Sequence, residues 1–261
     1  MTEPTYEAIT FEQSGAIARI TLNRPDAANG MNHTMTRELA DAARRCDTVG
    51  TKVVVLTGSG RFFCAGGDLK AFSTAPARGQ FIKGVADDLH RAISSFARMD
   101  AVLITAVNGT AAGAGFSLAV TGDLVLAAES ASFTMAYTKV GLSPDGSSSY
   151  YLPRLVGMRR AQELMLTNRT LSAAEAQDWG LVTEVVADAD LAERAGKLAE
   201  QLAGGSAGSN GAVKTLLLSS LKNSLEEQME AEGRLIAARA DSADGREGVD
   251  AFLAKRRPDF A

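Results

Sequence analysis

Two hydrophobic periodicities alternate along the first half of the chain. Apolar and polar residues alternate over 5–11 and 16–22, on either side of Ser14-Gly15, which predicts a β-hairpin. Short and almost continuous apolar runs predict buried strands at 52–58, 101–109 and 122–129. Helical spacing of apolar residues predicts helices at 33–47 and 79–98. This alternation favours an α/β fold in which helices pack on sheets.

After about residue 157 the helical period takes over. Helices are predicted at 159–167, 173–179, 190–202, 212–221, 225–240 and 245–254, with one strand at 182–186. The small and flexible residues of 205–211 predict a short loop. We therefore expect a core over residues 1–200 and a helical assembly region over 201–261.

Charge and composition exclude several classes of partner. The 261 residues include 27 Lys or Arg and 31 Asp or Glu, so the formal net charge is −4. A chain without a basic field is not expected to bind nucleic acid. The longest aliphatic run, Ala101–Val107, is too short to span a membrane. With two histidines and no paired cysteine motif, the chain has no support for a metal site.

The cysteine content and the N-terminal segment both bear on where the protein works. Cys46 and Cys64 are too few for a disulfide framework and fit a reducing compartment. The segment MTEPTYEAITFEQ is acidic and lacks the apolar stretch of a signal or transit peptide. We therefore expect a cytoplasmic protein.

Glycine-rich segments follow two of the predicted strands. They are FFCAGGDL at 62–69 and NGTAAGAGFSL at 108–118. Glycine lets a ligand approach the main chain closely, and the start of a helix offers unpaired N–H groups. Two such segments at neighbouring strand ends would aim two N–H donors at one oxygen, as an oxyanion hole for an enolate does. Neither segment has the spacing of a dinucleotide fingerprint or a P-loop. The alternative is that these glycines serve tight helix–strand packing.

Ordered motifs along nearly the whole chain resemble the crotonase, or enoyl-CoA hydratase/isomerase, superfamily. They are NRPDAANGMN (23–32), VVLTGSGRFFCAGGDL (54–69), AVNGTAAGAGFSLAVTGDLVLAAESASF (106–133), GLSPDGSSSYYLPRLVG (141–157), LSAAEAQDWGLV (171–182) and FLAKRRPDF (252–260). The resemblance implies an α/β fold, a crotonase-like spiral of ββα units with a helical C-terminal trimerisation region. It also implies a homotrimer or a dimer of trimers. The substrate it implies is an acyl-CoA thioester, with coenzyme A as part of the substrate rather than a separate cofactor.

The resemblance also assigns binding roles. The two oxyanion N–H groups fall on Gly67 and on Ala114, where the family commonly has glycine. Lys70 is placed to meet the 3′-phosphate of coenzyme A, although an ordinary solvated lysine is the alternative. The remaining substrate-binding positions implied by the family are Asp26, Ala27, Ala28, Ala65, Gly66, Asp68, Leu69, Ser117, Phe252 and Lys255.

The catalytic positions of the family carry a mixed set of residues here. Enoyl-CoA hydratases resembling this chain place glutamates where it has Ser117 and Tyr137, so hydration by two carboxylates is not expected. Asp145 lies where similar isomerases carry an acid or base, and the 1,2-epoxyphenylacetyl-CoA isomerase group has a closely similar Pro-Asp element. The alternative for Asp145 is an aspartate that only stabilises a turn or caps a helix.

A second comparison is with the 4-chlorobenzoyl-CoA dehalogenases, which this chain resembles over 154–182. Those enzymes use an aspartate at the position of Asp145 as a nucleophile, a histidine at His90 and a tryptophan at Tyr137. Histidine titrates near neutrality and can activate water. A histidine packed on a helix face is the alternative for His90.

The expected function is isomerisation of the double bond of an enoyl-CoA, or of a related ring-acyl thioester, through an enolate held in the oxyanion hole. Dehalogenase-like hydrolysis, hydration by a non-standard route and non-catalytic acyl-CoA binding remain alternatives. Aromatic residues that would line an apolar acyl pocket, or equally belong to the core, are Phe72, Phe81, Phe116 and Tyr137.

Overall fold

A six-stranded sheet forms the centre of the protein. The computed structural model describes residues 5–47 and 50–260. The strands lie in the order β1-β2-β3-β5-β7-β10, and only the β1–β2 pair is antiparallel. Their bounds are β1 (Ile9–Ser14), β2 (Ile17–Leu22), β3 (Val53–Gly58), β5 (Val102–Val107), β7 (Leu124–Ala128) and β10 (Glu184–Val186). The predicted hairpin and the predicted strands of this sheet are confirmed. Every residue of β5 is buried, as parallel strands covered on both faces require.

A second, four-stranded sheet was not predicted. It consists of β4 (Phe62–Cys64), β6 (Thr110–Ala112), β8 (Ser132–Thr134) and β9 (Leu171–Ser172), in that order. The glycine-rich segments therefore contain strands of their own, β4 and β6, which pair in parallel. Strands of two or three residues are too short for a hydrophobic period to reveal them.

The two sheets are built by one repeated unit. A strand of the large sheet is followed by a strand of the small sheet and then by a helix, as in β3–β4–α2, β5–β6–α4 and β7–β8–α5. This is the spiral of ββα units that the resemblance implied. Because β4 and β6 are parallel neighbours, the segments that leave their ends lie side by side.

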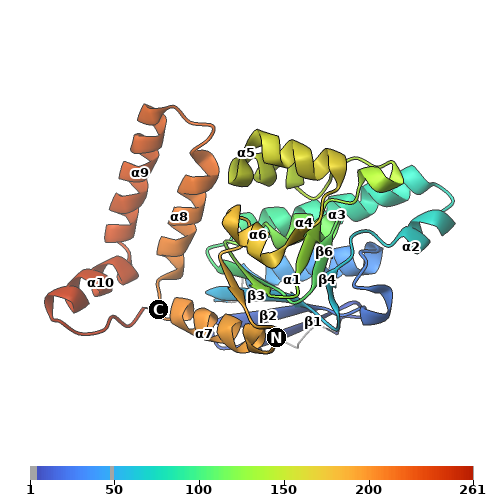
Figure 1. Ribbon diagram of the computed structural model, residues 1–261. Helices are drawn as coiled ribbons and strands as arrows, with labels where there is room; N and C mark the ends of the chain where they lie inside the picture. Colours follow the sequence, from blue (N-terminus) through green and yellow to red (C-terminus); the bar gives the residue numbers. More distant parts are fainter. Residues whose placement is uncertain (1–4, 48–49, 261) are drawn as a thin grey trace.

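Helices cover the sheets and separate them from solvent (Figure 1). Helix α1 (His33–Cys46) begins at Asn32, whose side chain accepts a hydrogen bond from Met35 N, and it packs along α3 (Arg78–Arg98). Helix α7 (Leu191–Ala203) packs on β2, β3, β5 and β7. Shorter elements complete the core: α2 (Leu69–Thr74), α4 (Ala114–Ala119), α6 (Ala173–Asp178), η1 (Pro25–Ala27), η2 (Thr138–Val140) and η3 (Asp188–Asp190).

Two helices begin earlier than predicted. Helix α5 runs over Ser148–Thr167 with a kink at Gly157, whose φ is 79°. The helical spacing of apolar residues therefore predicted only the part after the kink. Helix α8 runs over Ala207–Ser219, and the prediction of a loop at 205–211 is wrong. The side chain of Ser206 accepts a hydrogen bond from Ser209 N, so it caps a helix that the glycines alone would disfavour.

The last helices form an arm beside the core. Helices α9 (Leu225–Ala240) and α10 (Ala243–Leu253) project away from both sheets, at the opposite end of the view from α2 (Figure 1). The expected division near residue 200 stays a prediction. None of the helices within 5–47 and 50–260 has the length and apolar character that crossing a bilayer requires.

Candidate active site

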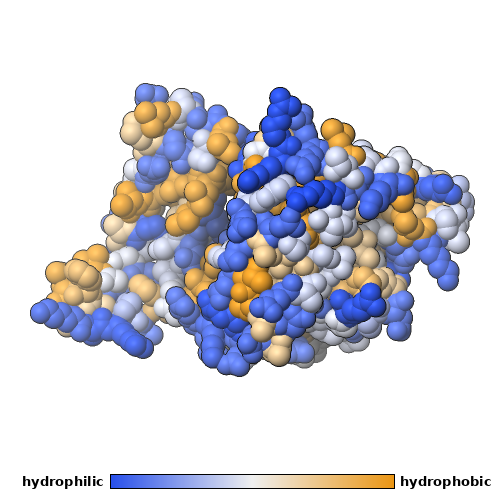
Figure 2. All heavy atoms as spheres, viewed as in Figure 1, coloured by the Kyte–Doolittle hydropathy of each residue, from blue (hydrophilic) through white to orange (hydrophobic). Residues whose placement is uncertain are grey.

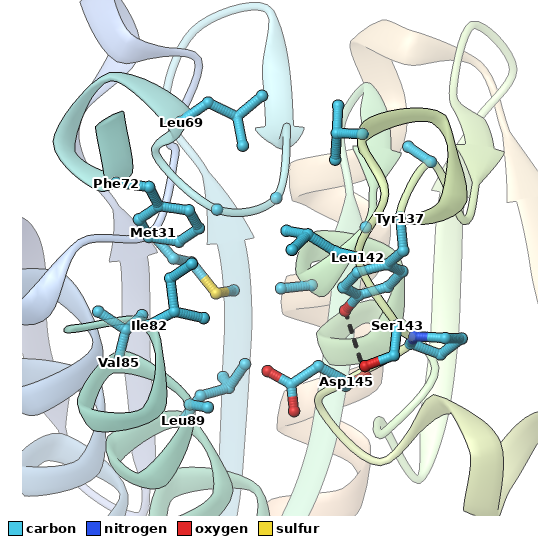
Figure 3. Close-up of a pocket in the computed structure, with 18 of the residues that line it drawn as sticks. Met31, Leu69, Phe72, Ile82, Val85, Leu89, Tyr137, Leu142, Ser143 and Asp145 are labelled. Carbon is cyan, nitrogen blue, oxygen red and sulfur yellow. Dashed lines mark hydrogen bonds between the residues drawn. The ribbon is translucent and has the colours of Figure 1, made fainter. Parts of the chain in front are cut away.

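A cavity of about 420 Å³ opens where the segments that leave β4 and β6 meet helix α3. Figure 3 shows apolar side chains from α2 and α3 facing Tyr137, Leu142 and Asp145 across it. Among the described residues that line this cavity, Asp145 is the one carboxylate. Lys83 of α3 also lines the cavity, and the large apolar lining residues are Met31, Leu69, Phe72, Ile82, Val85, Leu89, Val140 and Leu142. A cavity with these walls suits an apolar ligand group.

The first main-chain donor at the cavity is the N–H group of Gly67. Met31 N donates to Gly66 O over 2.7 Å, and Asp68 N donates to Met31 O over 2.9 Å. Met31 and Gly67 thus form an isolated parallel β-bridge, whose hydrogen bonds use the carbonyl group of Gly66 and the N–H group of Asp68 rather than the N–H group of Gly67. The N–H group of Gly67 is therefore left for a ligand. No side chain fits here, because a Cβ atom would lie 2.5 Å from the ring of Phe72.

The second donor is Ala114 N, at the first position of α4. The first N–H groups of a helix have no partner within the helix, and they carry its positive dipole end. Ala114 and Gly67 both line the cavity. The two segments are in contact, since a Cβ atom on Gly66 would lie 2.9 Å from Ala112 O and 3.5 Å from Ala114 N. Two main-chain N–H groups at one cavity are what the predicted oxyanion hole requires.

Polar contacts hold the Gly67 segment in place. The side chain of Asp68 caps α2 by accepting a hydrogen bond from Ala71 N over 3.0 Å, and it pairs with Arg24 over 2.9 Å. Partial burial opposes ionisation of Asp68, but these two partners outweigh it and lower the pKa of the carboxyl group. Burial also raises the pKa of the neighbouring Cys64 thiol to about 12, so Cys64 stays neutral and is no nucleophile.

Asp145, which lines the cavity, forms a solvent-accessible pair with His90. Nε2 of His90, on α3, lies 2.6 Å from Oδ1 of Asp145. Asp145 lines the cavity, whereas His90 lies behind it and lines a second, smaller depression with Arg98, Tyr150 and Tyr151. The chemistry therefore available is proton transfer or nucleophilic attack by Asp145, with His90 as its partner.

Ser117 and Tyr137 occupy the two positions that carry glutamates in the hydratases. Ser117 is fully buried on α4, and it does not line the cavity among the residues described there. Tyr137 lines the cavity, and burial raises the pKa of its phenol well above the usual range. Both hydroxyl groups bond to the main-chain oxygen of Asp145. Neither supplies a base at neutral pH.

The structure brings together some of the expected binding residues and separates others. Asp26, Ala27 and Ala28 lie in or directly after η1, beside the Gly67 segment, because Ala65 N donates to Ala28 O over 3.0 Å. Ala65, Gly66 and Leu69 line the cavity, and Lys70 is exposed on α2 next to it. Phe252 and Lys255 are exposed on α10 and just after it, at the far end of the molecule (Figure 1). Within one chain these two residues do not reach the cavity.

Two of the four aromatic candidates belong to the core. Phe116 is fully buried and packs on Phe133, so of the two alternatives left open for it the core is confirmed. Phe81 packs on Phe72 and His33 behind the wall rather than in it. The aliphatic walls of the cavity were not predicted. Helical spacing indicates that residues such as Val85 and Leu89 are buried, but it does not tell whether they face the core or a ligand cavity.

Comparison with known proteins places this site in a family. Residues 12–261 match the family model described as enoyl-CoA hydratase/isomerase. The chain belongs to the enoyl-CoA hydratase/isomerase family. It is 40% identical to a 1,2-epoxyphenylacetyl-CoA isomerase of Escherichia coli, over 97% of this chain and 98% of that protein. It is 36% identical to a 4-chlorobenzoyl coenzyme A dehalogenase of an Arthrobacter species, over 88% of this chain and 84% of that protein.

A solved structure supports the same placement of the fold. An enoyl-CoA hydratase from a Polaromonas species superposes with a TM-score of 0.90 at 34% identity, covering 98% of this chain and all of that one. These relatives of the enoyl-CoA hydratase/isomerase family bear names for three different reactions. Family membership establishes an acyl-CoA enzyme, and the choice of reaction depends on the residues of this site.

Proposed function

We propose that this enzyme shifts the double bond of an enoyl-CoA thioester through an enolate. The observation that carries the proposal is Asp145, the single carboxylate among the described residues of the cavity, facing two main-chain donors across apolar walls. Hydration by the two-glutamate route needs a second carboxylate, and the hydroxyl groups of Ser117 and Tyr137 do not replace it.

The mechanism follows from this placement. The thioester oxygen accepts hydrogen bonds from Gly67 N and Ala114 N, which weakens the C–H bonds next to the carbonyl. Asp145 takes a proton from C2, and the electrons of that bond move into the enolate. Asp145 then returns the proton to C4, so the C3–C4 double bond becomes a C2–C3 double bond. One carboxylate serves both steps, and the aliphatic walls contributed by α2 and α3 accept an uncharged acyl group.

The test uses a 3-enoyl-CoA, whose isomerisation gives a conjugated 2-enoyl product that is followed by its absorbance. We expect Asp145→Asn to lose turnover by about 10³-fold, because general acid–base catalysis supplies 10²–10⁴-fold. Binding of the thioester, measured by calorimetry, should survive in this variant. The matched control is Asp178→Asn, an exposed aspartate on α6, which should keep the full rate. Unchanged turnover in Asp145→Asn would remove Asp145 from the mechanism.

The His90–Asp145 contact of 2.6 Å favours a second candidate, hydrolytic dehalogenation of a ring-acyl thioester. The carboxylate would attack the ring carbon that bears the halogen, and the halide would leave. His90 would then take a proton from the water that hydrolyses the resulting aryl ester. A panel of 3-enoyl, epoxyphenylacetyl and 4-halobenzoyl thioesters separates the two candidates. Release of halide without isomerisation would replace the first proposal with the second.

The C-terminal arm supports assembly as a homotrimer or a dimer of trimers. Hydrophobic residues gather along α8 and α9 on the arm (Figure 2). The exposed ones are Val213, Leu217, Leu221, Leu225, Met229 and Ile236. Single chains rarely expose so continuous an apolar face. Light scattering on the purified protein should give three or six times the mass of one chain, and a monomer would contradict this assembly.

A further inference from the structure

The main chain at Asp145 has no regular structure to support it. Asp145 lies between η2 (Thr138–Val140) and α5, and the two residues after it both have positive φ, 62° at Gly146 and 67° at Ser147. Such a turn has few intrinsic restraints on the direction of the preceding side chain. Something outside the turn must therefore fix the carboxylate if it is to act on a bound thioester.

Three hydroxyl groups from different places converge on the main-chain oxygen of Asp145. Ser117 Oγ donates to it over 2.7 Å, and Ser148 Oγ donates over 2.9 Å. Tyr137 Oη lies 3.2 Å from the same oxygen, the contact drawn as a dashed line in Figure 3. Ser117 belongs to α4, the helix that begins at the oxyanion donor Ala114, so this contact ties Asp145 to the oxyanion hole.

The hydroxyl protons of Ser117, Ser148 and Tyr137 are engaged in hydrogen bonds within this cluster. Serine and tyrosine each have one O–H donor. Ser117 Oγ and Tyr137 Oη lie 3.1 Å apart, so the phenol donates either to Ser117 or to the Asp145 oxygen. In both arrangements the phenolic proton stays inside the cluster. The buried phenol also stays neutral, because desolvation raises its pKa. It has no proton to offer a substrate without breaking the cluster.

Gly146, directly after Asp145, packs closely against Ser117. A Cβ atom added to Gly146 would lie 2.9 Å from Ser117 Cβ and 3.3 Å from a methyl group of Leu89. The turn that carries Asp145 is therefore pressed against Ser117.

From these contacts we propose that Ser117 and Tyr137 are positioning residues that clamp the main chain of Asp145 and so aim its carboxylate between the cavity and His90. The inference rests on the proposed role of Asp145 in the reaction. The two positions that carry glutamates in the hydratases thereby serve a different purpose in this chain. Tyr137, which the resemblance marked as a catalytic candidate, then acts through Asp145 rather than on the substrate.

The test compares Ser117→Ala, Tyr137→Phe and the double variant on the thioester that the wild-type protein turns over. Losing one clamping hydrogen bond should lower kcat about fivefold while KM changes by less than about twofold. The double variant should lose less than the product of the two single losses, because both hydroxyl groups share one acceptor. The pH profile of kcat should keep its shape in all three variants.

The control is Thr57→Val, which removes a hydroxyl group that donates to Ala106 O over 2.8 Å on β3, away from Asp145. It should lower the melting temperature as the clamp variants do and leave kcat unchanged. Unaltered kcat in both single variants would overturn the clamp, and so would a limb of the pH profile that vanishes in Tyr137→Phe. Turnover that persists in Asp145→Asn would instead overturn the proposed function, so the two failures are distinguishable.

Discussion

Gly67 shows how much one residue contributes to the site. Its N–H group is free because the bridge to Met31 uses its neighbours, and its missing side chain leaves room for the ring of Phe72. In Gly67→Ala the new Cβ atom would lie 2.5 Å from that ring, so the segment or the ring must move. A misplacement of about 1 Å costs about 10²-fold in rate, and we expect kcat/KM to fall by that factor.

The matched control for this substitution is Gly233→Ala on α9, where nothing lies within 4 Å of the added Cβ atom. This variant should keep the wild-type kcat/KM and gain a little helix stability. The measurement is the kcat/KM of both variants by steady-state kinetics. A Gly67→Ala enzyme at full rate would show that the Gly67 N–H group is not aimed at the reacting oxygen.

Residue patterns alone predicted that both glycine-rich segments would meet at one site, and Gly67 and Ala114 do line one cavity, because glycines clustered after buried strands allow close approach to the main chain. The pairing of His90 with Asp145 was beyond that reasoning, since 55 positions separate them and no local pattern brings them together. Only the family resemblance pointed to both residues. The hydrogen bonds from Ser117 and Tyr137 to the main-chain oxygen of Asp145 were not predicted, because no sequence pattern marks a hydroxyl group as the donor to a distant carbonyl.

Among the elements, α8 shows how a helix is fixed to the core by one buried lysine. Lys214 Nζ donates to Phe96 O and to Ala101 O, each over 2.7 Å, and it lies 2.9 Å from Oδ2 of Asp123. Lys214 is buried whereas Asp123 is partly accessible, and removing the lysine leaves the carboxylate of Asp123 and two main-chain oxygens without their donor. We expect Lys214→Met to lower the free energy of unfolding by about 3 kcal/mol, whereas Lys222→Met in the exposed turn after α8 should have little effect.

This loss should depend on pH in a defined direction. Burial raises the pKa of Asp123 even in the presence of Lys214, and without the lysine only the hydrogen bond from Leu103 N offsets that burial. A carboxyl group whose pKa is higher in the folded state binds its proton more tightly there, so falling pH favours folding. Urea unfolding should therefore show a smaller deficit for Lys214→Met at pH 5 than at pH 8. A deficit that grows on acidification would contradict this reading of Asp123.

Long elements were predictable and short ones were not. The helices α1, α3 and α9 show the apolar period over three or more turns, and their bounds agree with the prediction to within a residue or two. The strands of the small sheet are two or three residues long and are held by pairing with one another rather than by a pattern of their own. The start of α8 was hidden because its glycines and serines have low helix propensity, which the Ser206 cap and the Lys214 contacts overcome.

At the scale of the whole molecule, the reaction site depends on the way the ββα units stack. Parallel pairing of β4 with β6 sets Gly67 beside Ala114, and the third unit brings Asp145 to the same cavity. The C-terminal helices α9 and α10 lie away from the cavity and expose an apolar face, which suits them to contacts between chains. The proposed reaction site and the proposed assembly surface therefore lie on separate parts of one chain.

The most direct test of the central claim is a crystal structure with a non-reactive acyl-CoA thioester bound. The account predicts that the thioester oxygen lies about 2.7–3.1 Å from both Gly67 N and Ala114 N. It also predicts that the carboxylate of Asp145 faces the carbon atoms next to the carbonyl. A thioester oxygen turned away from both N–H groups would contradict the account.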